Sequence, residues 1–324
     1  MSGEGEFDLI ARLAPFLAKG GDGLVVGHGD DAAVLDIGGR GVCLAVDVLV
    51  DDVHFRRDVS SLADVGWKAV AVNCSDMAAM GASPAVAVVG LCRPVSVAAS
   101  DIEELYRGMA AACEEWGLRL VGGDTVSAQA LALSVTVLGD VDVDKAVRRS
   151  GAQVGDRVLL VGDLGRAAAG LALVSKGLEA SDDLLAAHRR PVAHVTAGIA
   201  LSAAGATAMT DVSDGFGADL LHICEASGVA AVIDVAALPV APDVTAAARA
   251  LGIDPVDFVV GGGDDYALLA TVPAASAVAI ADQVGGVLVG EIVAGAPSAT
   301  LRSEDGSTRD LAGQGWDHYR KTTS

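Results

Sequence analysis

The chain has 324 residues, enough for two domains of ordinary size. Its 22 Lys and Arg residues against 43 Asp and Glu residues give a formal net charge of −21. This charge repels phosphate backbones and anionic lipids, so we expect no nucleic acid partner and no membrane partner. Hydrophobic residues make up 52% of the chain but aromatic residues only 3%, which suits a core of Ala, Val and Leu in α/β layers.

The cysteines and the first residues indicate a reduced protein without a targeting signal. The five cysteines form no C-x-x-C pair, and each lies among apolar residues, as core thiols of cytoplasmic proteins do. The segment MSGEGEFDLIARL is acidic where a signal peptide would be basic, and no apolar run approaches the length of a membrane span. We therefore expect a cytoplasmic protein.

The first part of the chain, residues 1–145, predicts an N-terminal domain. Its first long helix begins with a capping box at Ser61 and Asp64, and the next helix ends at Gly117. We expect the following elements in chain order: an amphipathic segment at 7–17, a buried strand at 41–50, helices at 61–81 and 100–117, and strands at 118–121 and 131–138.

The charged segment 140–149 predicts the boundary to a second α/β domain at 146–324. Helical stretches alternate there with apolar, β-branched runs. The predicted strands lie within or near 155–165, 206–212, 229–235, 257–260, 266–272 and 286–293.

Asp76 is the most informative residue of the sequence. At helical spacing it shares a stripe with Val65, Ala69 and Val72, so the pattern directs its carboxylate toward the core. Asp47 interrupts the apolar strand GVCLAVDVLV in the same way. Because an ionised buried carboxylate is very costly unless it is paired or bound to a metal, both residues require partners.

Two explanations of these carboxylates remain open. Each aspartate could cap a helix or meet a buried Arg or Lys, which is the usual fate of a single buried charge. The number of such residues favours shared divalent cations instead, because the chain has few cations near them. The aspartates at the ends or interiors of apolar segments are Asp30, Asp31, Asp47, Asp76, Asp124, Asp211, Asp214, Asp264 and Asp265.

The ligand types indicate Mg²⁺ or Mn²⁺. The six histidines form no cluster at zinc-ligand spacing, no calcium-binding loop occurs, and carboxylates beside glycine turns are hard oxygen ligands. Mg²⁺ usually shares its coordination shell with phosphates, so a nucleotide enzyme is indicated, although no Walker-type or dinucleotide loop is present. Phosphates would then meet metal ions, cations such as Arg149, and the helix N-terminus after Ser213.

The motifs resemble, in order and over nearly the whole chain, those of the thiamine-monophosphate kinase family within the aminoimidazole ribonucleotide synthetase superfamily. The segments that carry the resemblance are GDDAAVL, VDVLVDDVHF, WKAVAVNCSDMAAMGASP, GGDT, RSGAQVGD, DVSDG, GGDDYAL and GWDHY. The resemblance implies transfer of the γ-phosphate of ATP to thiamine monophosphate, the final step of thiamine diphosphate biosynthesis. It further implies a two-domain α/β (α+β) fold and a homodimer in which the N-terminal sheets form a barrel at the interface.

The resemblance also implies roles for individual residues. The implied ligands of several Mg²⁺ ions, the first five also taken as catalytic, are Asp30, Asp47, Asp76, Asp124, Asp211 and Asp214. The implied contacts with ATP are Tyr106, Gly123, Asp124, Arg149 and Ser213. The implied contacts with the thiamine end are His54, Asp264 and Trp316. In the GDD turn, Asp30 would face the metals, while Asp31 would orient the turn or bind through water.

The sequence departs from the family pattern at three places. His28 stands where the family commonly has Ile, and Ala45-Val46 replaces small hydroxyl residues before the strand aspartate. The family motif GGEDYEL reads GGDDYAL here, so the shorter Asp264 replaces Glu.

Several of these residues also have ordinary structural interpretations. His54 would suit a surface beside Arg56 and Arg57, Trp316 could anchor the C-terminal tail, and Tyr106 lies on an apolar helix stripe. Arg149 lies near a domain boundary, where solvated charges are common. For the whole chain the alternatives are a related ATP-dependent enzyme with another acceptor, a metal-binding scaffold, and a halophile-type acidic surface.

Overall fold

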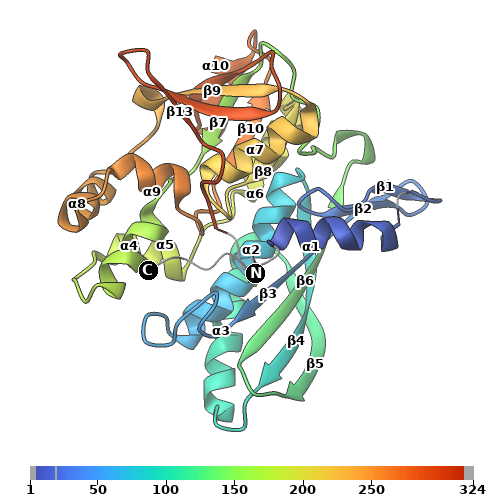
Figure 1. Cartoon of the computed structure of the whole chain (residues 1–324). Coiled ribbons are helices and arrows are strands. Elements are labelled where there is room, and N and C mark those ends of the chain that lie inside the picture. The colour runs from blue at the N-terminus through green and yellow to red at the C-terminus, as the bar shows by residue number, and fades with distance from the viewer. Residues whose placement is uncertain (1–4, 19, 317–324) are drawn as a thin grey trace.

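The computed structural model describes residues 5–18 and 20–316, and Figure 1 shows two units of sheet and helix, one above the other. The N-terminal sheet has the strand order β1-β2-β3-β6-β4-β5, in which only the β4–β5 pair is parallel. Its strands are β1 (Leu24–Val26), β2 (Ala33–Asp36), β3 (Gly41–Val50), β4 (Ser83–Arg93), β5 (Arg119–Ser127) and β6 (Ala132–Val141). The helical segments of this part are α1 (Glu6–Leu13), η1 (Ala14–Phe16), α2 (Leu62–Ala79) and α3 (Ala99–Trp116).

The C-terminal sheet is also mixed, with the order β13-β12-β9-β11-β7-β10-β8 and one parallel pair, β12–β9. Its strands are β7 (Arg157–Val161), β8 (Ala208–Asp211), β9 (Ala230–Asp234), β10 (Leu268–Val272), β11 (Val287–Val293), β12 (Ser298–Arg302) and β13 (Thr308–Asp310). The α-helices are α4 (Arg166–Ser175), α5 (Asp182–Arg189), α6 (Val195–Ala204), α7 (Phe216–Ser227), α8 (Pro242–Leu251), α9 (Pro255–Gly261) and α10 (Ala277–Val284), and the short 3₁₀ segments are η2 (Val143–Lys145) and η3 (Val235–Ala237).

Most of the predicted elements are confirmed. The strand predicted at 41–50 is β3, and the capping box of Ser61 and Asp64 begins α2. Helix α3 ends at Gly117 in the left-handed conformation, with φ of 71°. The predicted division after residue 145 falls between β6 and β7 and stays a prediction.

Two predicted details are wrong. Residues 257–260 form part of helix α9 rather than a strand, because Asp254 caps the backbone N–H of Val256 and Pro255 occupies the first turn. Helix α3 begins at Ala99, one residue before the predicted start, since Asp101 accepts the backbone N–H of Ala98. Short apolar runs and helix starts are where local capping overrides residue pattern.

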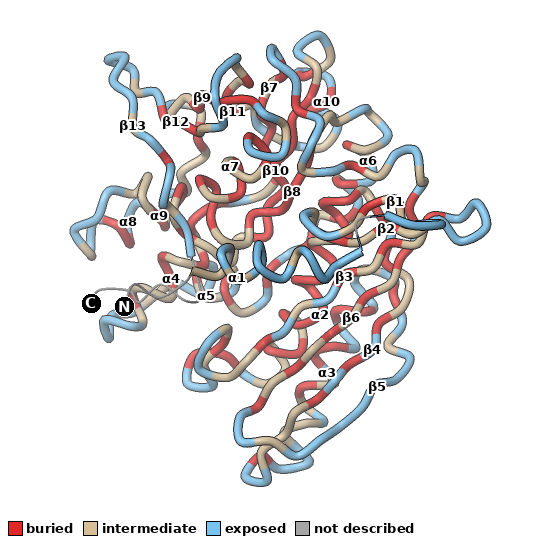
Figure 2. The backbone as a smooth tube through the Cα atoms, turned by 45° about the vertical axis from the view of Figure 1, so that its right-hand side comes forward, coloured by how far each residue is buried: buried red, intermediate tan, exposed pale blue. Residues whose placement is uncertain are grey.

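The N-terminal sheet is open, with β1 and β5 at its edges, so the described part of this chain forms no closed barrel. Helices α2 and α3 lie along one face of this sheet (Figure 1). The opposite face carries exposed apolar side chains, including Val46 and Val48 of β3 and Val126 of β5. Figure 2 shows β5 exposed along most of its length. No described helix is long and apolar enough to cross a membrane.

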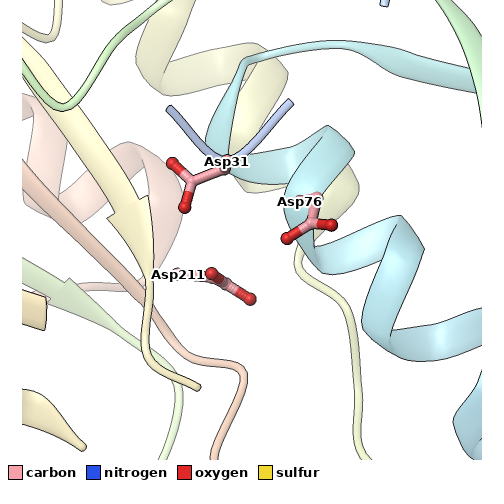
Figure 3. A group of neighbouring side chains, drawn as sticks. All are labelled: Asp31, Asp76 and Asp211. Atoms are coloured by element: carbon pink, nitrogen blue, oxygen red, sulfur yellow. The ribbon is translucent and has the colours of Figure 1, made fainter. Parts of the chain in front are cut away.

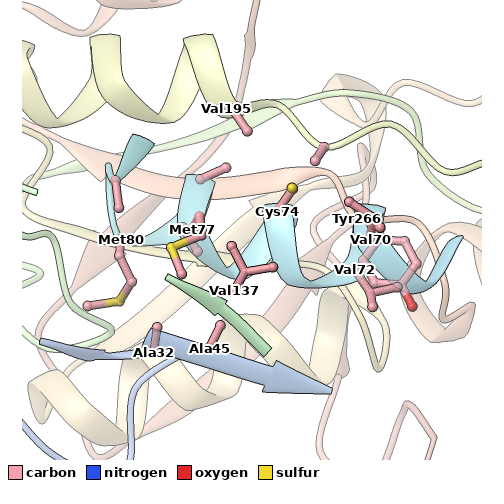
Figure 4. Close-up of a cluster of buried hydrophobic side chains, with 14 of the residues drawn as sticks. Ala32, Ala45, Val70, Val72, Cys74, Met77, Met80, Val137, Val195 and Tyr266 are labelled. Carbon is pink, nitrogen blue, oxygen red and sulfur yellow. The ribbon is translucent and has the colours of Figure 1, made fainter. Parts of the chain in front are cut away.

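Helix α2 packs against both sheets. Its side chains are buried around the whole circumference, the pattern expected of a helix enclosed on all sides. Met77 and Val72 join Ala45 of β3 in one core cluster, which also includes Val195 of α6 and Tyr266 before β10 (Figure 4). One continuous core therefore fixes the two halves of the chain relative to each other.

Close packing of α2 against α3 depends on two glycines. A Cβ at Gly66 would lie 1.9 Å from the carbonyl oxygen of Leu105, and a Cβ at Gly108 would lie 1.8 Å from that of Ala63. These contacts are with backbone atoms, which no side-chain movement can relieve.

We predict that Gly108→Ala lowers the free energy of unfolding by about 1–3 kcal/mol, because overpacking forces the two helices apart. Helix propensity alone predicts the opposite, a gain of roughly 1 kcal/mol. Urea unfolding of the variant and of the matched exposed-site control Glu115→Ala distinguishes the two. A Gly108→Ala protein as stable as the control would contradict the close-packing argument.

Candidate active site

A cavity of about 670 Å³ lies where α2, the end of β3 and the loops after β8 and α9 meet. Its walls come from both halves of the chain. Asp47 and Asp76 line it from the N-terminal half, and Asp211 and Asp214 line it from the C-terminal half. The structure therefore brings four of the six predicted ligand aspartates to one cavity, and Asp30 and Asp124 do not line it.

Three carboxylates form the centre of the acidic group. Asp31 precedes β2, Asp76 lies on α2, and Asp211 ends β8. One oxygen atom of each lies within 4.8 Å of one oxygen of the other two. Figure 3 shows the three side chains directed into one space. All three ligand atoms are carboxylate oxygens, the donor type that Mg²⁺ and Mn²⁺ prefer.

Asp31 is held with one oxygen paired and the other unpaired. Its Oδ1 accepts hydrogen bonds from Arg149 at 2.7 Å and from the Thr210 hydroxyl at 2.9 Å. Its Oδ2 is buried and has no hydrogen-bond partner among the described residues. Because a buried unpaired acceptor is costly, this atom fits a cation bound between the three carboxylates.

The acidic group also shifts its own pKa values. Burial raises the pKa of Asp47 to about 6 and that of Asp211 to about 7, and the negative charge of Asp31 adds to both shifts. Burial and the neighbouring Asp47 raise the pKa of Asp76 well above its ordinary value. Asp47 and Asp76 share a hydrogen bond, and the Ser75 hydroxyl donates to Asp211 at 2.6 Å. Without cations, these carboxyl groups therefore keep their protons to a higher pH than exposed aspartates do.

The two aspartates of the GDD turn have different partners in the structure, and these differ from the expected ones. Asp30 accepts the backbone N–H of Arg149 at 2.6 Å, whereas Asp31 joins the three-carboxylate group. Asp31 is therefore a candidate direct ligand, a role that the sequence analysis gave to Asp30. Nothing in the sequence distinguishes the neighbours, because the local turn decides which carboxylate points inward.

Tyr106, Gly123 and Asp124 do not line this cavity. Asp124 lies on exposed strand β5 and lines a separate hollow of about 150 Å³ together with Val48 of β3. A Cβ at Gly123 would lie 2.0 Å from the Val89 carbonyl oxygen, so strand packing alone requires glycine there. Tyr106 packs against the core from α3, as its stripe position predicts.

Ser213 and Asp214 line the cavity just before helix α7. The buried carboxylate of Asp219 accepts the backbone N–H groups of Asp214 at 3.2 Å and Gly215 at 3.1 Å. This contact fixes the turn at the helix N-terminus, where the helix dipole favours an anion.

The three predicted thiamine-end residues, His54, Asp264 and Trp316, also line the cavity. Asp264 contacts Lys68 of α2, whose Nζ lies 2.7 Å from its Oδ2. The His188 ring of α5 lies 3.2 Å from the same oxygen. Sequence reasoning missed Lys68 and His188, although a lysine on an otherwise apolar helix carries the same signal as Asp76.

Comparison with known proteins identifies the class. The family pattern described as "AIR synthase related protein, N-terminal domain" matches residues 29–141, and the corresponding C-terminal domain pattern matches residues 153–301. The chain belongs to this two-domain class.

Individual relatives narrow the class to one family. The thiamine-monophosphate kinase of Mycobacterium tuberculosis is 44% identical over 82% of this chain and 80% of the relative. That of Salmonella typhimurium is 34% identical over 97% of this chain and 98% of the relative. A solved structure described as AaThiL complexed with AMPPCP and TMP is 30% identical, with a TM-score of 0.85 and 97% of each chain covered. The chain belongs to the thiamine-monophosphate kinase family.

We predict that the metal-free protein loses stability as the pH rises from 5 to 8. Because the pKa values of Asp47 and Asp211 are raised to about 6 and 7, folding takes up protons above roughly pH 4, and this stabilisation is lost as the pH passes through 6–7. Mg²⁺ replaces those protons, so it should raise Tm more at pH 8 than at pH 5.

Differential scanning fluorimetry at constant ionic strength measures both effects. Asp211→Asn should lose most of the Mg²⁺-dependent shift, whereas the exposed-site control Glu304→Gln should keep it. An equal Mg²⁺ shift in wild type and Asp211→Asn would show that the ion acts on the general acidic surface instead.

Proposed function

We propose that the chain transfers the γ-phosphate of ATP to thiamine monophosphate and produces thiamine diphosphate and ADP. The observation that carries the proposal is a single cavity lined both by Asp76 and Asp211 of the three-carboxylate group and by the predicted thiamine-end residues. Membership of the thiamine-monophosphate kinase family supports the reaction. The solved relative with AMPPCP, an ATP analogue, and TMP supports the two substrates.

The residues suited to hold Mg²⁺ are Asp31, Asp76 and Asp211. Asp76 and Asp211 line the cavity together with Asp47 and Asp214, and Asp31 lies next to them. When bound, Mg²⁺ would neutralise phosphate charge and align the reacting oxygens. The predicted metal-ligand roles of Asp30 and Asp124 stay predictions. Asp30 contacts the Arg149 backbone, and Asp124 lies outside the cavity.

The remaining groups of the cavity position the two substrates. The N-terminus of α7, beside Ser213 and Asp214, places the positive end of a helix dipole at the cavity wall, where it favours a phosphate. The acceptor phosphate is already ionised at neutral pH, so no side chain needs to act as a general base. We therefore propose direct in-line transfer; a labelled phosphoenzyme that survived denaturation would contradict it.

We also propose that the chain works as a homodimer. The exposed face of the N-terminal sheet presents Val46, Val48 and Val126, and apolar surface of this kind is typical of an interface. Two such sheets meeting face to face would form the barrel expected from the family resemblance, with Asp124 on the covered face. Sedimentation as a monomer at micromolar concentration would contradict this part of the proposal.

We predict that Asp76→Asn lowers kcat/KM at least about 100-fold. The substitution removes a negative charge needed to bind the metal, and a bound metal stabilises the transition state by several kcal/mol. A coupled ADP-release assay with thiamine monophosphate measures the loss, and Glu304→Gln serves as the control. Aminoimidazole precursors tested as acceptors distinguish a related enzyme. Undiminished activity of Asp76→Asn would overturn the assignment of the acidic group.

A further inference from the structure

A buried lysine links two segments that the proposed function places at the thiamine end of the cavity. The Lys68 side chain is only 3% exposed. Its Nζ donates to Asp264 Oδ2 at 2.7 Å and to the backbone carbonyl of His54 at 3.2 Å. His54 follows β3 and Asp264 precedes β10, so one ammonium from α2 contacts both halves of the chain.

Asp264 is fixed by more than this ion pair. The Tyr266 hydroxyl donates to Asp264 Oδ1 at 3.0 Å, and the Asp264 backbone N–H donates to the Ser213 carbonyl at 2.8 Å. The His188 ring lies 3.2 Å from Oδ2. Asp264 and Tyr266 adopt φ of 68° and 53°, in a region that non-glycine residues rarely occupy. Such a conformation persists where the surroundings determine it from several directions.

The charge and exposure of Asp264 suit a ligand on the cavity side. Burial alone would raise the pKa of Asp264, but attraction to Lys68 and His188 outweighs it and holds the pKa well below its ordinary value. Lys68 and His188 both approach Oδ2, whereas Oδ1 receives the single Tyr266 hydroxyl. The side chain remains 32% exposed on the cavity wall. A carboxylate oxygen accepts more than one hydrogen bond, so Oδ1 retains capacity for an N–H donor.

The same lysine constrains the neighbouring histidine. Lys68 holds the His54 backbone through its carbonyl, and the His54 Nδ1 accepts the backbone N–H of Val50 at 3.1 Å. In the neutral ring the proton is therefore on Nε2. The ring is thus held by Val50, and the Lys68 contact is one of the hydrogen bonds that hold the His54 backbone.

We propose that Lys68 is a positioning residue for acceptor recognition: its ammonium holds the Asp264 carboxylate in place at the cavity wall and fixes the His54 segment, so that Asp264 Oδ1 accepts an N–H of an aminopyrimidine ring. This inference rests on the proposed function and deepens it by naming the group that prepares the acceptor end. Lys68 acts through Asp264 and His54 rather than on the reacting phosphates, so its loss should weaken one substrate selectively.

The test compares Lys68→Met, Asp264→Asn and the double variant with the exposed-site control Lys176→Met. Lys68→Met should raise the KM for thiamine monophosphate about tenfold or more and change the KM for ATP less than twofold, in line with the loss of a charge-assisted hydrogen bond. Asp264→Asn should show the same selective loss. The double variant should resemble the single variants rather than the product of their effects, because both act through one contact.

Several results would overturn the proposal. A folded Lys68→Met protein with an unchanged KM for thiamine monophosphate, or with both KM values raised alike, would leave Lys68 only a structural role. If Lys68→Met does not fold, Asp264→Asn decides, and an unchanged acceptor KM in that variant rejects the proposal.

Failure of the proposed function is recognised separately. In that case the wild type releases no ADP with thiamine monophosphate and Mg²⁺. Calorimetric titration of the folded variants with thiamine monophosphate alone then tests Lys68 without turnover. Affinity in Lys68→Met or Asp264→Asn equal to that of the wild type, or absence of binding to the wild type, would reject the proposal.

Discussion

Carboxylates that repel one another are held together where the two sheets meet. Asp31, Asp76 and Asp211 come from a turn, a helix and a strand end, and each is tied to rigid structure of its own. Arg149 and Thr210 satisfy one oxygen of Asp31, but the other remains buried without a partner among the described residues. Such a group is stable only with protons or cations, and a cation bound there can attract the phosphates that the acidic protein otherwise repels.

Helix α2 makes this arrangement possible. It is buried on all sides and shares one core with both sheets, and the glycines at its crossing with α3 hold it close. Asp76 and Lys68 both line the cavity from this helix, eight residues and therefore about 12 Å apart along its axis. The spacing between the acidic group and the proposed acceptor end is thus set by a rigid element, which suits a reaction that depends on the alignment of two substrates.

Local patterns account for what could be predicted from the sequence. The carboxylate of Asp76 on an apolar helix stripe and that of Asp47 in an apolar strand pointed to the cavity because burial of charge is rarely without cause. Lys68 carries the same signal, because it is a charged residue buried on the same helix. The sequence pattern could not show which of Asp30 and Asp31 joins the acidic group, since the conformation of the turn determines it. The helix at 255–261 looked like a strand because a short apolar run fits both periods, and Asp254 and Pro255 decided the outcome.

The central claim is that these side chains hold divalent cations. The most direct measurement is a crystal structure of the protein with Mn²⁺, an ATP analogue and thiamine monophosphate, with the metal positions taken from anomalous scattering. We expect a peak at coordination distance from oxygens of Asp31, Asp76 and Asp211, with phosphate oxygens completing its ligands. Fully bound nucleotide whose metal peaks lie away from all three carboxylates would contradict the claim.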